Sequence, residues 1–273
     1  MNIGMMLGRL SEKYNQPLQS FPINNWEEEF DNAARIGFDS IEWVEDGFSD
    51  QENPLFNSGG RQSLKDMQKI KKVYIHSVCA HSFISGGFIS SNKVEREIWI
   101  DRLKLIIDCS NEIGSDVIIL PLMDDFSINS IEKEELLIDS FSKIPPLPSH
   151  LKILVETDLS AKTCLNLLNK IDRSDLGIVY DLGNSTQLNH DLHEDIKCLH
   201  HIIGEVHLKD KDNSASFRLG NGNTDFEAAF SALRECKWQG RFVLETPIFN
   251  NWQQEAEKNF LFAKRLISSI ESA

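Results

Sequence analysis

The feature of this sequence that most constrains its fold is a regular alternation of short apolar runs with longer segments of helical periodicity. Short runs rich in Val, Ile and Leu are typical of strands buried on both faces, and the longer amphipathic segments are typical of helices that cover them. The expected strands are 2–6, 39–44, 73–80, 116–122, 152–157, 176–181, 203–208 and 241–246. The expected helices are 26–36, 63–71, 94–113, 131–141, 160–171, 191–202, 224–237 and 252–269.

Eight strand–helix units in 273 residues leave about 34 residues for each unit, with no long linker between them. This repeat predicts an α/β fold, a single (β/α)8 TIM barrel over residues 1–273. An open, doubly wound sheet is the alternative. No strand is followed by the Gly-rich dinucleotide fingerprint that often accompanies such a sheet, so the barrel is favoured.

Local signals mark the ends of some helices. Asn25 and Glu28 have the spacing of a capping pair at the start of the helix 26–36, and Gly37 follows its last residue. We therefore expect the Asn25 side chain to cap that helix and Gly37 to end it.

The charge and the cysteines restrict the partners and the compartment. The formal net charge is −14, which repels nucleic acid and anionic membranes and favours a small molecule or a cation. Five cysteines without a close pair indicate a reduced environment, and the N-terminus lacks the pattern of a signal peptide. We expect a cytoplasmic protein that binds neither nucleic acid nor membranes.

Four polar residues interrupt the apolar strands close to their carboxyl ends. They are Glu156, Asp181, His207 and Glu245, on four successive expected strands. The carboxyl ends of barrel strands form the active-site rim, so these side chains share one small space there. Three crowded carboxylates need a cation, and oxygen-rich ligation with one imidazole favours Mn²⁺, Mg²⁺ or Co²⁺, with Zn²⁺ possible. For any single acid, a helix cap is the alternative interpretation.

Several segments of the sequence, including those that contain these four residues, resemble a known family. The segments ETD, YDLGN, VHLKD with RLGNGNTDF, and LETP are similar to the sugar isomerase and epimerase group of xylose isomerase-like barrels, as are GRL and FPINNWEEEFDNAARIGFDSIEW near the N-terminus. The resemblance covers essentially the whole chain. It implies that Glu156, Asp181, His207 and Glu245 bind one divalent metal, that Glu156 and Glu245 are also the catalytic acid–base pair, and that the chain forms a homo-oligomer.

The implied reaction is proton abstraction next to a carbonyl through a metal-bound enediolate. Return of the proton to the opposite face of the same carbon gives epimerisation, and return to the adjacent carbon gives ketose–aldose isomerisation. An inosose-type dehydratase and a hydroxypyruvate-type isomerase use the same kind of site and remain alternatives. Gly220 and Gly222 could bring backbone amides to an anion, but a tight turn into the helix that begins at Thr224 explains them as well. The expected substrate is therefore a sugar or a sugar phosphate, with its phosphorylation left open.

Five further residues are expected to bind substrate. His81 and Arg218 fit the family's substrate contacts, although a structural histidine and a surface arginine are the alternatives. Asn184 stands where many relatives carry His, which puts the identity of the sugar in doubt more than the reaction. Glu42 and Lys209 lie near the expected rim; solvated loop charge is the equal alternative for Lys209.

Two other classes of protein are alternatives to the isomerase. Endonucleases that cut DNA at abasic sites resemble this barrel, but they need further His and Asp ligands that PLMDD, Asn184 and Arg218 do not supply. With a net charge of −14, the sequence also lacks the excess of basic residues that is typical of a protein that binds a phosphate backbone. A non-catalytic sugar-binding barrel stays open, although the presence of two candidate bases argues against it.

Overall fold

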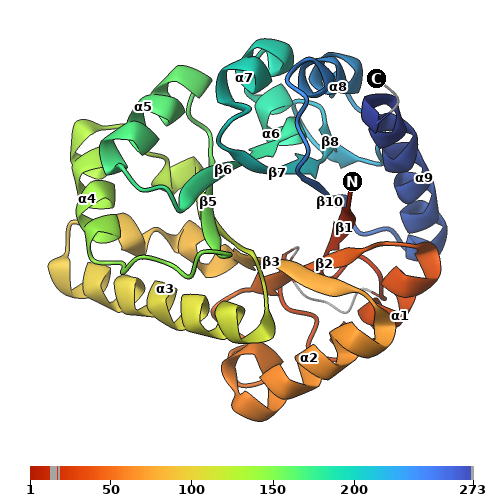
Figure 1. Ribbon diagram of the computed structural model, residues 1–273, viewed down its shortest axis with the longest axis horizontal. Coiled ribbons are helices and arrows are strands. Elements are labelled where there is room, and N and C mark those ends of the chain that lie inside the picture. The colour runs from red at the N-terminus through yellow and green to blue at the C-terminus, as the bar shows by residue number, and fades with distance from the viewer. Residues whose placement is uncertain (13–16, 18, 272–273) are drawn as a thin grey trace.

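Eight parallel strands close into a barrel with helices around its outside in the computed structural model, which describes residues 1–12, 17 and 19–271 (Figure 1). The barrel strands are β1 (Ile3–Met6), β2 (Ser40–Glu45), β3 (Tyr74–Ala80), β4 (Val117–Leu122), β5 (Lys152–Thr157), β6 (Leu176–Asp181), β7 (Ile203–Leu208) and β10 (Arg241–Leu244). Their order around the barrel is β1-β10-β7-β6-β5-β4-β3-β2, and β1 also pairs with β2. The predicted (β/α)8 TIM barrel is confirmed, and the open sheet is wrong.

Helices connect the strands and cover the barrel. They are α1 (Trp26–Ile36), α2 (Ser58–Lys71), α3 (Lys93–Ile113), α4 (Ile131–Ser142), α5 (Ala161–Ile171), α6 (Leu182–Gln187), α7 (Leu192–Leu199), α8 (Phe226–Glu235) and α9 (Trp252–Glu271). Short 3₁₀ turns lie at Pro54–Phe56, His81–Ser85, Gly87–Ile89 and Asp124–Phe126. The sequence did not indicate α6, nor the antiparallel hairpin of β8 (Asp210–Lys211) and β9 (Ser216–Phe217).

Of the two helix-end predictions for α1, the one for its C-terminal end is confirmed and the one for its N-terminal end is not. Gly37 ends the helix with a φ of 109°, in the left-handed region that glycine adopts without steric cost. The capping prediction for Asn25 is wrong. Its side-chain amide donates to the backbone oxygen of Glu12 at 3.0 Å, and only its backbone oxygen accepts from the Glu28 N–H. Asn25 therefore ties the β1–α1 loop to the helix.

The inside of the barrel is apolar over part of its length. Cys79, Val117, Ile119, Leu154 and Val179 form a separate buried cluster there. Leu154 is packed so closely that a Cβ atom on Gly204 would lie 2.7 Å from its side chain. Because side chains alternate along a strand, residues two positions further toward the carboxyl ends face the same interior. This packed layer closes the barrel below those positions.

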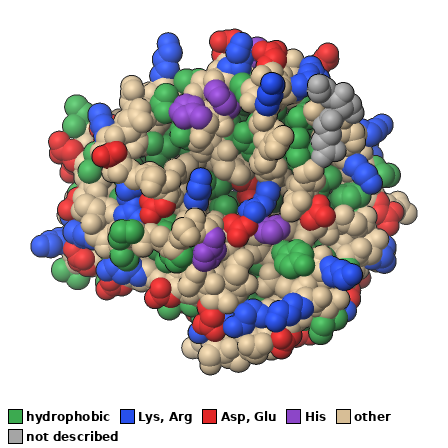
Figure 2. All heavy atoms as spheres, in the orientation of Figure 1, with side chains coloured by type: hydrophobic (Ala, Val, Ile, Leu, Met, Phe, Trp, Pro, Cys, Tyr) green, Lys and Arg blue, Asp and Glu red, His purple; other side chains and the backbone are tan. Residues whose placement is uncertain are grey.

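A larger apolar core fills the space between the barrel and its helices, and it includes Phe30, Ile41 and Leu103. On the face that Figure 2 presents, acidic and basic side chains are interspersed around the surface and do not gather into one basic region. Among the helices of the described residues, none combines the length and apolar character needed to cross a membrane.

Candidate metal centre

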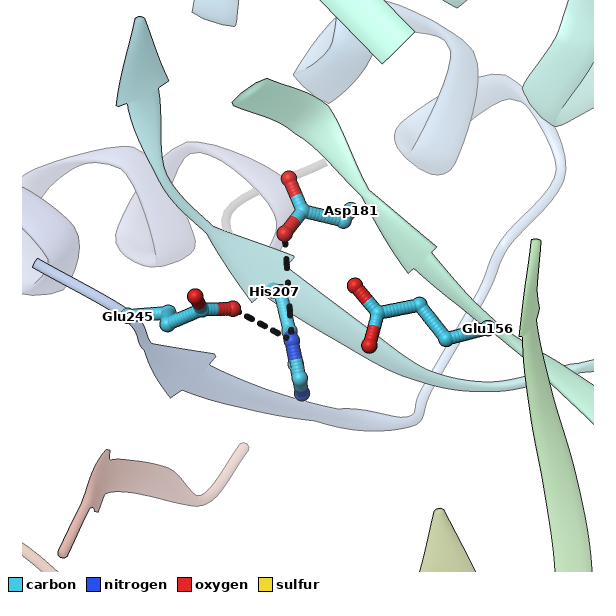
Figure 3. Close-up of side chains that lie close together, drawn as sticks. All are labelled: Glu156, Asp181, His207 and Glu245. Carbon is cyan, nitrogen blue, oxygen red and sulfur yellow. Dashed lines mark hydrogen bonds and ion pairs between the residues drawn. The ribbon is translucent and has the colours of Figure 1, made fainter. Parts of the chain in front are cut away.

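Four side chains from neighbouring strands meet above the apolar layer. Glu156 lies on β5, Asp181 ends β6, His207 lies on β7 and Glu245 directly follows β10. His207 pairs in register with Asp181 on one side and with Val243 on the other, which brings Glu245 close. All four residues are buried, with exposed fractions between 0% and 8%. Figure 3 shows the three carboxylates converging on one edge of the imidazole.

The distances within this ring of four residues are short. Nδ1 of His207 lies 3.3 Å from Oε2 of Glu245 and 4.0 Å from Oδ2 of Asp181. One donor atom from each of the four residues can be chosen so that all lie within 4.8 Å of one another. Three oxygen donors and one nitrogen at this spacing suit a hard or borderline divalent cation.

Lys209 places a positive charge beside the ring. Its Nζ lies 2.5 Å from Oε1 of Glu245 and 3.4 Å from Oδ2 of Asp181. Burial lowers the pKa of Lys209, but the surrounding carboxylates outweigh burial and raise it above the usual value. The ammonium therefore stays charged beside the acids.

The acids of the ring respond differently to this setting. Burial raises the pKa of Glu156 to about 8, and it also raises the pKa of Asp181. Burial opposes ionisation of Glu245 too, but Lys209 and His207 outweigh it and hold the pKa of Glu245 well below its usual range. For His207, burial lowers the pKa, and the facing carboxylates more than reverse this and raise it well above 6.5.

Asp181 shows that the ring fits a cation. Its Oδ1 accepts the backbone N–H of Asn184 at 2.7 Å, whereas Oδ2 is buried and accepts no hydrogen bond from the described residues. A buried carboxylate oxygen without a donor is costly unless a cation compensates it. The Lys209 ammonium forms an ion pair with Oδ2 at 3.4 Å but no hydrogen bond, so this oxygen keeps a free acceptor site. That site and the clustered donors fit a divalent ion held by Glu156, Asp181, His207 and Glu245.

A cavity of about 460 Å³ opens over the ring. Three of the predicted substrate residues, His81, Asn184 and Lys209, line it together with Glu156. Further lining residues that the sequence did not single out are Gln19, Ile84, Met123, Asp124, Gln187 and Lys211. The cavity combines acidic, basic and amide groups with apolar side chains, a lining that a polyhydroxy compound can use.

Two amide side chains hold the glutamates of the ring. The side-chain amide of Asn184 donates to Oε1 of Glu156 at 3.0 Å and accepts from Nζ of Lys211 at 3.3 Å. Gln19 donates to Oε1 of Glu245 at 2.5 Å from the loop after β1. No periodic pattern marks that loop, so only the folded structure reveals Gln19.

Comparisons with known proteins agree with this architecture. Residues 30–266 match the family described as "Xylose isomerase-like TIM barrel". The chain belongs to this family. A curated relative, "Putative L-ribulose-5-phosphate 3-epimerase SgbU" of Haemophilus influenzae, is 23% identical over 264 residues, which cover 89% of this chain and 90% of the relative.

Solved structures share the fold of this xylose isomerase-like barrel. A D-allulose 3-epimerase from Methylomonas sp. in complex with D-allulose is 15% identical, with a TM-score of 0.77 over 97% of this chain and 96% of its own. The IOLI protein, in a structure with a zinc atom, is 16% identical, with a TM-score of 0.73 over 99% of this chain and 98% of its own. At these identities the likeness establishes the fold.

Two of the residues expected to bind substrate lie outside the cavity of this xylose isomerase-like barrel. Arg218 lies in the loop before α8, where its Nε is 3.6 Å from Oε2 of Glu255 on α9. Glu42 is fully buried beneath the ring, on the far side of His207. Neither residue is among those that line this cavity, and their roles in substrate binding stay predictions.

The glycines after β7 surround a carboxylate of the chain itself. The backbone N–H groups of Gly220, Asn221 and Gly222 donate to Oδ2 of Asp210 at 2.8 to 2.9 Å, and that of Thr224 donates to Oδ1 at 3.1 Å. The Gly-rich turn that could have held an anion thus has Asp210 as its occupant.

Proposed function

We propose that this chain is a divalent metal-dependent sugar isomerase or epimerase. The observation that carries the proposal is the ring itself: three carboxylates and one imidazole, all buried, converge beneath a cavity at the carboxyl ends of the strands. Barrel enzymes place their catalytic groups at that end. The family and the epimerases that share its fold support the same activity.

In this proposal Glu156, Asp181, His207 and Glu245 hold the metal, with Mn²⁺, Mg²⁺, Co²⁺ or Zn²⁺ as candidates. The zinc in the IOLI structure supports a divalent ion without deciding among them. When bound, such an ion acts as a Lewis acid that makes a C–H next to a ketose carbonyl more acidic.

The two glutamates are proposed to move the proton. Glu156 on β5 and Glu245, just after β10, lie on opposite sides of His207 in Figure 3. One carboxylate takes the proton from the carbon next to the carbonyl, and the other returns a proton. Return to the opposite face of the same carbon inverts it, which is the epimerase reaction. His81, Asn184 and Lys209, which line the cavity, would contact the hydroxyl groups.

The test follows the proton. Glu156→Gln and Glu245→Gln keep the side-chain size but remove the base, so each should slow deuterium exchange from D₂O into a bound ketose by about 10² to 10⁴-fold. NMR of D-allulose and of L-ribulose 5-phosphate, each with Mg²⁺-loaded protein, measures that exchange. Glu255→Gln is the matched control, because Glu255 pairs with Arg218 and Lys258 outside the cavity. Undiminished exchange in both ring variants would refute the proposal.

A further inference from the structure

Two carboxyl groups lie next to Nε2 of His207, on the edge of the imidazole that points away from the other three ring residues, Glu156, Asp181 and Glu245. Nε2 of His207 is 3.4 Å from Oε2 of Glu42 and 3.4 Å from Oε1 of Glu205. The side chains of all three residues have an exposed fraction of 0%. His207 is therefore enclosed between the acids of the ring on its Nδ1 side and a second pair of acids on its Nε2 side.

The strands dictate this placement. Glu205 precedes His207 by two residues on β7, so both side chains face the barrel interior. Glu42 comes from β2, where it pairs in register with Ser77 of β3, and the Ser77 hydroxyl donates to Oε2 of Glu42 at 2.9 Å. Ser77 thereby helps to fix the Glu42 carboxyl.

The carboxyl groups of Glu42 and Glu205 have oxygen atoms without a hydrogen-bond donor, and they lie next to Nε2 of His207, which has no acceptor among the described residues. Glu42 Oε1, both oxygens of Glu205 and His207 Nε2 make no hydrogen bond to the part of the chain that the structure describes, although the 3.4 Å contacts bring the two carboxyls within reach of Nε2. Buried polar atoms of this kind are rare and need a partner. The only groups that the structure brings to Nε2, among those described, are the two carboxyls.

We propose that Glu42 and Glu205 are positioning residues that accept the Nε2–H of His207 and so direct the lone pair of Nδ1 into the metal centre. A neutral imidazole carries its proton on one nitrogen, and the hydrogen bond to that nitrogen decides which one remains free to bind a metal. The opposite tautomer would aim the Nε2 lone pair at carboxyl oxygens. Partners of this type commonly change metal affinity by 10- to 100-fold. The inference rests on the metal site of the proposed function.

The same three groups could instead hold a second cation, since their donor atoms also lie within 4.8 Å of one another. The ring reaches the cavity over it through Glu156, whereas neither Glu42 nor Glu205 nor His207 lines that cavity. A metal site requires a path of entry as well as donors. Positioning of His207 therefore explains the pair better than a second ion does.

The experiment uses the purified chain and Zn²⁺ alone. Glu205→Gln and Glu42→Gln should each weaken Zn²⁺ binding by 10- to 100-fold in a chelator competition assay. The matched control is Glu29→Gln, because Glu29 is equally buried but accepts from Gly8 and Ser11 of the β1–α1 loop. Its Zn²⁺ affinity should change less than twofold. Ser77→Ala is a milder variant in case a glutamate variant fails to fold, and about a two- to fivefold weakening is expected.

A second readout separates positioning from a structural role. In Zn²⁺-loaded protein with ¹⁵N-labelled histidine, we expect a protonated Nε2 and a metal-shifted Nδ1 for His207, and a shifted Nε2–H signal in the two glutamate variants. Wild-type affinity and an unchanged signal in those variants would overturn the inference alone. Two zinc ions per wild-type chain, with one lost in each variant, would overturn it in favour of a second metal site. Absence of Zn²⁺ binding by the wild type would overturn the metal centre and this inference together.

Discussion

Asp181 and Asp210 are both buried aspartates at the carboxyl ends of neighbouring strands, yet their surroundings differ. Asp210 accepts four backbone N–H groups at 2.8 to 3.1 Å. Asp181 accepts one, and its other oxygen accepts no hydrogen bond from the described residues and has the Lys209 ammonium at 3.4 Å and Nδ1 of His207 at 4.0 Å. Backbone dipoles that the fold supplies compensate the first carboxylate, whereas the second depends on cations.

This difference separates a structural acid from a candidate ligand. A carboxylate whose oxygens are filled by backbone donors stabilises the turn that supplies them, and it has little capacity left for a metal. A carboxylate with an orphaned buried oxygen costs the fold stability, unless an ion compensates it. The Gly-rich turn after β7 therefore has a structural acid at its centre, whereas the ring of Glu156, Asp181, His207 and Glu245 contains a candidate metal ligand.

The largest effect should appear in metal binding. Asp181→Asn removes a proposed ligand and its charge, so Mn²⁺ affinity should fall at least 10²-fold. Asp210→Asn, a matched change at the start of β8 just after β7, should leave the affinity within about threefold, because the oxygens of Asp210 accept backbone N–H groups of the Gly-rich turn. Isothermal titration with Mn²⁺ measures both. Equal losses in the two variants would remove the distinction between the acids.

Stability should respond in the opposite order. An asparagine at position 210 presents one oxygen and one NH₂ group to four backbone donors, so at least one N–H faces another donor. We expect Asp210→Asn to lower the free energy of unfolding of the metal-free protein by about 2–3 kcal/mol. Asp181→Asn should change it by less than about 1 kcal/mol, because the loss of the Lys209 contact is offset by relief of a buried charge. Urea denaturation followed by circular dichroism decides between this order and its reverse.

The sequence predicted the elements that carry the ring better than the loops around it. The bounds of β5, β6 and β7 agree with the expected 152–157, 176–181 and 203–208, because each apolar run is short and ends in polar residues. Side-chain alternation then places Glu156, Asp181 and His207 together. Their role as ligands stays a prediction.

The loops could not be predicted in this way, because their conformation depends on contacts distant in sequence. Arg218 follows the β8–β9 hairpin, and its partner Glu255 lies on α9. Gln19 reaches Glu245 across 226 positions of sequence. In the sequence, Asp181 and Asp210 are both aspartates that end or follow apolar runs. Only the folded turn shows that backbone N–H groups already occupy the carboxylate oxygens of Asp210.

The smallest expected effect concerns protons in the ring. Burial raises the pKa of Glu156 to about 8, so at pH 7 the metal-free side chain is mostly protonated and must lose that proton to bind a cation. Each proton that Mn²⁺ binding releases should make the affinity for Mn²⁺ rise about tenfold per pH unit below the pKa of the group that releases it. The rise that comes from Glu156 should level off above pH 8.

Calorimetric titrations with Mn²⁺ at pH 7, in buffers of different ionisation enthalpy, measure the number of protons released on binding. Glu156→Gln should release one fewer proton than the wild type, whereas Asp210→Asn should release the same number. If Glu156→Gln and the wild type release equal numbers, Glu156 does not give up a proton to the metal, and its place among the ligands would have to be abandoned.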